Sequence, residues 1–327
     1  MKRFKNILCV VDPERECKPA LERAVALAEN NQANLTVITV APSISTVIGT
    51  PKDRPITIEL QAATVESHRK ELENRVGPYR QRIEIVTRVL IGTPFLVIIR
   101  EVLRNEHDIV IKCPESLEWL DRFLYSEDKH LLRKCPCPVW MVRPQIGAMF
   151  DRILAAVDVD DTYSSKELKT HQALNEMIIE LSSSLAMSEF AELYVANAWE
   201  AIGEGAMRYG SLMHRPENEV NEYVEEVRRN HEQQLDALMK KVSSKLSQEV
   251  LDYIKPQIHM PKGAACKVIP ELTKELQVDC VVMGTVARTG IPGLFIGNTA
   301  ETILDQLECS VLAIKPPGFV SPVTLEE

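Results

Sequence analysis

The sequence is 327 residues long, which at about 150 residues per domain predicts two domains. Its composition is that of an ordinary soluble protein, with 45% apolar residues, 26% charged residues and a net charge of −9. No stretch approaches the roughly 20 apolar residues of a membrane span, and the apolar run Ile7–Val11 is too short for a secretion signal. Basic residues are scattered without interleaved aromatic residues, so we expect no nucleic-acid site. Because no targeting segment is evident, we expect a cytoplasmic location.

Eight cysteines raise the question of disulfides or a metal. Cys9, Cys113 and Cys280 lie in or beside apolar runs, where a free cysteine behaves as a small hydrophobic residue. Cys135 and Cys137 are separated by one residue, not two, and no second cysteine pair lies at zinc-ligand spacing. We therefore expect reduced, structural thiols and no metal site.

The first half of the chain alternates between strand-like and helix-like patterns. An apolar run from Phe4 ends at Asp12, where a strand should give way to a loop and a helix. The next predicted elements are a helix over 20–28, a strand over 33–40, a long amphipathic helix over 58–75, a strand over 83–90, a helix over 94–103, a strand ending near Lys112, and a final helix and strand over 130–142.

The second half repeats this order. The run Phe150–Asp158 superposes on Phe4–Asp12 without gaps, and Thr302–Ile314 matches His130–Val142. Between them we predict a helix over 174–185, a strand over 191–197, a helix over 218–246, a strand over 257–260, a helix over 264–276 and a buried strand over 280–283. Pro270 lies deep in its predicted helix and should kink or shorten it.

Each half is therefore a β-α-β-α-β-α-β-α-β unit. The predicted fold class is α/β, with two tandem domains that each contain a five-stranded parallel doubly wound (Rossmann-like) sheet. Ligands of such sheets bind outside the carboxyl ends of the strands. Asp12, Asp158 and the loops after Lys112 and Met283 should lie on that edge.

The loop after Met283 has the layout of a phosphate-cradling loop. It starts at Gly284 and closes at Gly297-Asn298-Thr299, where a helix is predicted to begin. Glycine lets the backbone approach a ligand closely, and a helix N-terminus offers unpaired N–H groups to an anion. The corresponding loop of the first half contains no glycine.

These residues resemble the tandem universal stress proteins, and among them the E type, over essentially the whole chain. The strongest marks are Leu131–Val142 (LLRKCPCPVWMV) in the first half, and Gly284–Gly290 (GTVARTG) with Gly297–Glu301 (GNTAE) in the second. His171–Met177 (HQALNEM), at the start of a helix, adds weaker support. The resemblance implies a role in the stress response.

ATP-binding members of that family carry Gly-x2-Gly-x9-Gly-(Ser/Thr) after the fourth strand. Here the spacing is intact, but Ala287 replaces the second glycine and Asn298 replaces the hydroxyl residue. The resemblance implies a binding site made of Ala156, Val157, Asp158, Met283, Gly284, Ala287, Arg288, Gly297, Asn298 and Thr299. ATP or another adenine nucleotide is the implied ligand, with Mg²⁺ only if a nucleotide is bound.

The first half keeps Asp12 but lacks this loop. Its three glycine positions are taken by Cys113, Ser116 and Tyr125–Ser126. Pro114 removes a backbone donor, and the loop carries three acidic residues that would repel phosphate, namely Glu115, Glu118 and Asp121. We therefore expect a small-molecule ligand in the second domain only.

Several of these residues also have simpler interpretations. Asp158 either contacts a ribose or adenine group or caps the helix that follows. Asp160 and Asp161 are adjacent in an extended loop, so their side chains diverge, which favours a turn or cap role over a Mg²⁺ site. Arg288 either pairs with a phosphate or lies in solvent. The apolar stretch Ile291–Ile296 either packs on the core or lines a site for an apolar or acyl-bearing ligand.

The sequence contains no HExxH, GxSxG or Walker-type motif, and its seven histidines are dispersed. We therefore predict a binding protein that is not an enzyme. The alternatives are a scaffold or regulatory interaction protein with two vestigial sites, and slow hydrolysis of ATP.

In single-domain relatives, the last strand of each domain pairs across a dimer. The resemblance thus implies that Pro138–Val142 and Val311–Ile314 pair within this chain as an intramolecular pseudo-dimer. Further homo-oligomerisation stays open. We place the first domain at residues 1–143, the second at 150–317 and a C-terminal tail at 318–327.

Overall fold

The computed structural model describes residues 4–15, 17–49, 51–115, 126–144, 149–211, 213–245, 248–285 and 297–325. These residues form two compact units. The N-terminal unit contains the described residues up to Met149 together with Thr285 and 308–325, and the C-terminal unit contains 150–284 and 297–307. Within these ranges, none of the helices combines the length and the apolar character that crossing a membrane requires.

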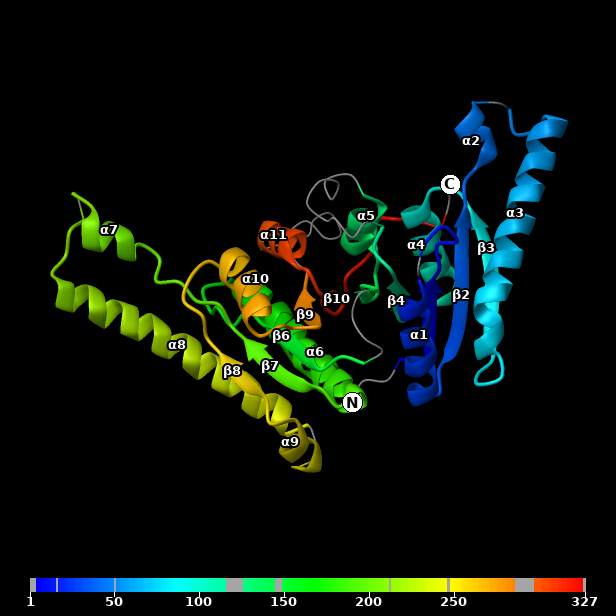
Figure 1. The fold of residues 1–327 in the computed structure, drawn as a ribbon. Coiled ribbons are helices and arrows are strands. Elements are labelled where there is room, and N and C mark those ends of the chain that lie inside the picture. Colours follow the sequence, from blue (N-terminus) through cyan, green and yellow to red (C-terminus); the bar gives the residue numbers. More distant parts are fainter. Residues whose placement is uncertain are drawn as a thin grey trace. The chain divides into compact units, whose positions relative to one another are not determined.

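The N-terminal unit is built on a sheet with the strand order β3-β2-β1-β4-β5-β10. Figure 1 shows β2 and β3 side by side at one edge of this sheet. Its strands are β1 (Asn6–Val10), β2 (Asn34–Ala41), β3 (Ile85–Ile91), β4 (Ile109–Lys112), β5 (Val139–Met141) and β10 (Ser310–Ile314). The first five strands are parallel, and Val10 at the end of β1 pairs with Lys112 at the end of β4. β1 and β4 are buried almost throughout, as expected of central parallel strands.

Helices connect these strands. They are α1 (Lys18–Asn31), α2 (Ile44–Ile48), α3 (Pro55–Val76), the 3₁₀ turn η1 (Gly77–Tyr79), α4 (Pro94–Asn105) and α5 (Glu127–Lys134). The periodicity predicted α1, α3, α4 and α5 but neither α2 nor η1. α1 packs on β1, β2 and β4, whereas α3 packs on β2 and β3. Pro94 is the first residue of α4, where its missing N–H costs little.

The C-terminal unit repeats the pattern around a parallel sheet ordered β9-β6-β7-β8. Its strands are β6 (Arg152–Ala156), β7 (Glu192–Ala196), β8 (Gln257–His259) and β9 (Cys280–Gly284). Its helices are α6 (Ser165–Glu189), α7 (Glu204–Tyr209), α8 (Glu217–Ser243), α9 (Gln248–Ile254), α10 (Ala265–Glu275) and α11 (Asn298–Gln306). The short helices α7 and α9, on either side of α8 in the sequence, were not predicted, and α8 ends at Ser243, before the predicted end at 246.

Pro270 does not shorten its helix, which was one of the two effects expected of it. α10 continues through Pro270 to Glu275. A proline in a helix leaves the carbonyl four residues earlier without its usual N–H donor, and here that carbonyl belongs to Cys266. The side-chain amide of Gln306 in α11 donates to the Cys266 carbonyl at 3.0 Å. A tertiary hydrogen bond thus replaces the missing helical one.

The last strands of the two sequence repeats pair with each other, as expected. β10 runs antiparallel to β5, with Val311 opposite Met141 and Ala313 opposite Val139. β10 therefore belongs to the N-terminal unit, although its sequence completes the second repeat. This exchange satisfies the outer edge of β5 with backbone hydrogen bonds.

Candidate functional site

The carboxyl ends of β6 and β9 form one edge of the C-terminal sheet. Ala156 and Met283 are in register on these neighbouring strands. Val157 and Asp158 therefore leave the sheet next to the end of β9, whose last residue is Gly284. Val157 and Met283 are buried and belong to the core, whereas Asp158 is exposed.

Asp158 organises the loop after β6 and does not cap α6, so the interpretation as a helix cap is wrong. Its carboxylate accepts from the backbone N–H of Asp160 at 3.2 Å and from the Tyr163 hydroxyl at 2.5 Å. The cap of α6 is Ser164, whose N–H and hydroxyl both donate to Glu167. The loop between Asp158 and Ser164 is too long for the aspartate to reach the first turn of the helix.

Two buried asparagines hold the backbone of this loop. Asn175 of α6 accepts from the Asp158 N–H at 3.2 Å and donates to the Asp158 carbonyl at 2.6 Å. Asn197, directly after β7, accepts from the Val159 N–H at 3.3 Å. Sequence reasoning missed both roles, although Asn175 lies in the HQALNEM stretch. Because the backbone is fixed at both residues, the position of the Asp158 carboxylate is fixed as well.

Asp160 and Asp161 diverge, as predicted. Asp160 accepts from the Thr162 N–H at 2.9 Å, which is a turn role, whereas Asp161 accepts from the Asn230 amide of α8 at 3.2 Å. Among the residues that the structure describes, no group of three or more His, Cys, Asp or Glu side chains is arranged to hold a metal ion.

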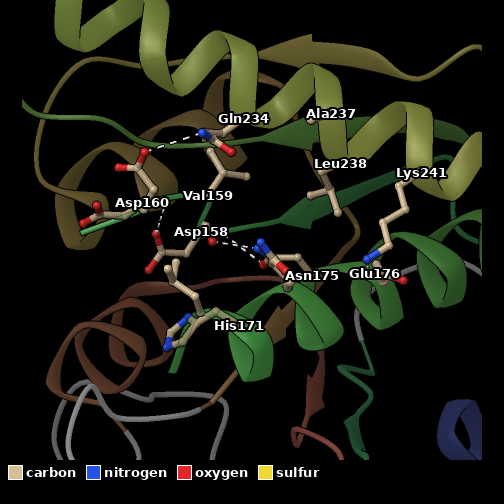
Figure 2. Close-up of a pocket in the computed structure, with 13 residues that line it drawn as sticks. Asp158, Val159, Asp160, His171, Asn175, Glu176, Gln234, Ala237, Leu238 and Lys241 are labelled. Atoms are coloured by element: carbon tan, nitrogen blue, oxygen red, sulfur yellow. Dashed lines mark hydrogen bonds and ion pairs between the residues drawn. The ribbon is translucent and has the colours of Figure 1, made fainter. Parts of the chain in front are cut away.

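A cavity of about 330 Å³ lies between this loop, α6 and α8 (Figure 2). Its walls are Asp158, Val159, Asp160, Asp161, Leu168, His171, Gln172, Asn175, Glu176, Gln234, Ala237, Leu238 and Lys241. Glu176 is neutralised by Lys241 and Lys245, each at 2.6 Å; burial acts against ionisation, but the two lysines hold the pKa of Glu176 below its usual range. The three aspartates and the amide groups suit ligand hydroxyl and amino groups, not phosphate.

Gly284 packs closely against α6. A Cβ at this position would lie 2.5 Å from Cδ2 of Leu174, the residue before Asn175 in α6, so the Leu174 side chain would have to move. This packing gives a reason for glycine at this position that does not involve a ligand.

Gly297 is the N-cap residue of α11 and has an extended conformation, and no side chain among the described residues caps this helix. Asn298 and Thr299 in the first turn are exposed. An uncapped helix N-terminus presents N–H groups and the positive end of the helix dipole to an anion. The predicted site residues Ala287 and Arg288 and the apolar stretch Ile291–Ile296 lie outside the described residues.

The corresponding edge of the N-terminal unit is filled by its own side chains. Ser126 caps α5 by accepting from the Lys129 N–H. Asp128, the second residue of α5, forms a buried ion pair with Lys112 at the end of β4 and accepts from the Glu115 N–H at 2.6 Å. The predicted repulsive residues Glu118 and Asp121 lie outside the described residues. The carboxylate of Asp128 thus stands where a bound anion would interact with the helix.

The buried pair also determines how Lys112 titrates. Burial on its own would lower the pKa of Lys112, but the charges of Asp128 and Glu115 outweigh it and hold that pKa above the usual range. The lysine is therefore a permanent cation with an internal partner. In the C-terminal unit the equivalent strand position is Met283, and the second residue of α11 is Thr299.

Comparison with known proteins identifies the class of this two-unit α/β protein. The family model described as the universal stress protein family matches residues 3–143 and 149–315. The chain therefore belongs to the universal stress protein family, with two tandem domains.

Its full-length relatives are of the E type. Universal stress protein E of Salmonella typhi and that of Escherichia coli K12 are each 31% identical to the chain, covering 100% of it and 99% of the relative. A universal stress protein E homolog of Haemophilus influenzae is 30% identical over 96% of the chain and 98% of the relative.

A solved structure agrees with this assignment. A putative universal stress protein from Pseudomonas aeruginosa UCBPP-PA14 superposes with a TM-score of 0.66 at 26% identity, covering 96% of this chain and 94% of that one. A universal stress protein from Archaeoglobus fulgidus has a TM-score of 0.61 at 13% identity, which shows the shared fold alone.

Proposed function

We propose that this protein is a non-catalytic, cytoplasmic stress-response protein that binds one nucleotide-type ligand, in its second domain only. The observation that carries the proposal is the contrast between the two helix N-termini. Among the described residues, Ser126 caps α5 and Asp128 places a carboxylate in its first turn, whereas no side chain caps α11 and Asn298 and Thr299 in its first turn are exposed. The two domains belong to one family, and these side chains differ between them.

The ligand class follows from the chemistry of the two ends of the site. N–H groups at the start of α11 favour a phosphate, aided by the side chains of Asn298 and Thr299. Asp158, held at the neighbouring strand end and lining the cavity, favours a hydroxyl or amino group such as those of ribose and adenine. An adenine nucleotide carries both chemistries, and Mg²⁺ would accompany it through the phosphates and not through a protein metal site.

The test is a titration of the purified protein with ATP and Mg²⁺, followed by native mass spectrometry. We expect one nucleotide per chain. Gly297→Asp should abolish binding, because the new carboxylate caps α11 and repels the phosphate. The substitution suits the backbone, since φ at Gly297 is −61° and aspartate is a favoured N-cap residue.

Ser126→Asp is the matched control. It places the same residue at the same position of α5 and should leave nucleotide binding unchanged. Loss of binding in both variants, or in neither, would contradict the assignment to α11. Failure of the wild-type protein to bind ATP at millimolar concentration would reject the nucleotide and favour a scaffold role.

A further inference from the structure

Two thiols lie side by side at the start of β5. Cys135 follows α5 in an extended conformation, with φ −65° and ψ 130°. Residues two apart in an extended segment face the same side, and the Sγ atoms of Cys135 and Cys137 are 3.6 Å apart. Cys135 is fully buried and Cys137 is 8% exposed. The pair is free and reduced in this structure.

A buried lysine accompanies the pair. Lys315 directly follows β10, and since Ala313 pairs with Val139, the antiparallel register brings Lys315 towards the segment that carries the thiols. Lys315 is 5% exposed, donates to the Thr285 hydroxyl at 2.7 Å, and lies 4.9 Å from the centre of the Phe319 ring. Among the described residues, Cys135 is the ionisable side chain whose charge affects the pKa of Lys315.

The surroundings shift the pKa values of Lys315, Cys135 and Cys137, and not all in the same direction. Burial lowers the pKa of Lys315 to about 7, because a buried ammonium group loses its water. Burial on its own would raise the pKa of Cys135, but hydrogen bonds from Cys137 and the charge of Lys315 outweigh it, so this pKa lies below that of an ordinary thiol. Burial and the neighbouring Cys135 hold the pKa of Cys137 well above that of an ordinary thiol. Cys135 is thus the nucleophile and Cys137 the protonated partner.

We propose that Cys135 and Cys137 are a redox-active dithiol that hydroperoxides oxidise to an intramolecular disulfide. The Cys135 thiolate attacks a peroxide oxygen, the O–O bond breaks, and the leaving oxygen takes up a proton to become water or an alcohol. The Cys137 thiol then attacks the resulting sulfenic sulfur. An S–S bond forms, and the sulfenic hydroxyl leaves as water with the Cys137 proton. Two electrons pass from the dithiol to the hydroperoxide, and Lys315 acts as a positioning residue that stabilises the thiolate.

The geometry distinguishes this pair from the thiols inside the central strands, whereas Cys17 and Cys113 form a second hydrogen-bonded thiol pair, in which the pKa of Cys17 is lowered to about 7 by its hydrogen bond with Cys113. Cys9 and Cys280 lie within central strands, and burial raises the pKa of Cys9 far above that of an ordinary thiol. Cys135 and Cys137 lie between α5 and β5, outside the regular elements. The sulfur atoms must close from 3.6 Å to about 2.0 Å, which a local side-chain movement supplies.

The experiment treats fully reduced, full-length protein with hydrogen peroxide, alkylates the remaining thiols, and analyses tryptic peptides by mass spectrometry. Peptide 135–152 contains only these two cysteines. We expect it to lose two hydrogens and to escape alkylation, and reductant should reverse the change. Cys137→Ser should stop at a sulfenic acid that dimedone traps on Cys135, whereas Cys135→Ser should yield no such adduct.

Lys315 provides the mechanistic control. Lys315→Met should slow disulfide formation about tenfold, the loss of thiolate that follows when a thiol pKa rises by one unit. Lys315→Arg, which keeps the cation, should restore most of the rate. If both cysteines of wild-type peptide 135–152 are still alkylated after peroxide treatment, to the same extent as Cys280 in its own peptide, the proposal is wrong. An unchanged rate in Lys315→Met would remove Lys315 from it.

Discussion

At the scale of single residues, Gly284 shows how a motif residue can answer to packing. The sequence pattern assigns this glycine to close approach of a phosphate, yet its missing Cβ leaves room for Leu174 of α6. A substitution at Gly284 would therefore disturb the fold before it tested ligand binding. Gly297, with ordinary φ at an exposed helix start, is the better residue for that test.

Gly284→Ala should lower the free energy of unfolding by about 1–3 kcal/mol, the range for overpacking a core. The measurement is urea unfolding. Gly205→Ala is the control, because a Cβ at Gly205 meets no atom within 4 Å and alanine favours its helix. Combining Gly284→Ala with Leu174→Ala should cost less than the sum of the single changes; strict additivity would show that the two residues do not meet.

Local sequence patterns predicted the strands, the longer helices and the edge where Asp158 lies, because apolar periodicity and strand ends are local properties. They could not predict how that edge is built. Asn197 reaches the Asp158 loop from another strand, and Asp128 meets Lys112 across the end of a sheet. Such contacts depend on which segments the fold brings together. The same limit explains why the role of Asp158 as a helix cap failed: capping depends on the loop length before α6.

At the scale of elements, α5 and α11 are equivalent helices of the two sequence repeats that differ at their N-termini. The first turn of α5 supplies the carboxylate of Asp128, whereas the first turn of α11 carries Asn298 and Thr299, which are exposed. Each charge of a buried ion pair of this kind compensates the other, because removing either partner leaves the remaining charge unpaired in the interior. The chain itself contains an uncharged alternative, with methionine and threonine at the equivalent positions of the C-terminal unit.

Asp128→Thr should destabilise the protein by roughly 3–5 kcal/mol, because Lys112 is then buried without its partner. Adding Lys112→Met to that variant should restore most of the stability, since the pair then matches Met283 and Thr299. Arg82→Ala, which breaks the exposed pair with Glu29, should cost no more than about 1 kcal/mol. Thermal or urea unfolding measures all three. A double variant as unstable as the single one would contradict the comparison between the domains.

At the scale of the whole molecule, the exchange of β10 joins the two sequence repeats. The N-terminal unit needs a strand from the end of the chain to cover β5. The repeats are therefore separate in sequence but not in folding. Cutting the chain between them leaves a row of unpaired backbone groups on Val139–Met141.

A fragment of residues 1–149 should self-associate through β5, because an unpaired strand edge seeks another strand. Native mass spectrometry across a range of concentrations would detect the dimer. A peptide of residues 308–325, which contains β10, should compete with self-association. It should convert the dimer into a complex of one fragment with one peptide. A fragment that stays monomeric and ignores the peptide would show that β5 does not depend on β10.

The internal ion pair of Asp128 has a consequence for how the protein responds to its surroundings. A binding site stabilises its domain by mass action, by about 2.7 kcal/mol when the free ligand is at a hundred times its dissociation constant. Under the proposed function, the stability of the second domain therefore rises and falls with the cellular concentration of its ligand. In the first domain the anion is the carboxylate of Asp128, which is part of the chain, so its contribution to stability does not depend on a ligand concentration. The stability of the second domain then reports the metabolic state of the cell, and that of the first domain does not.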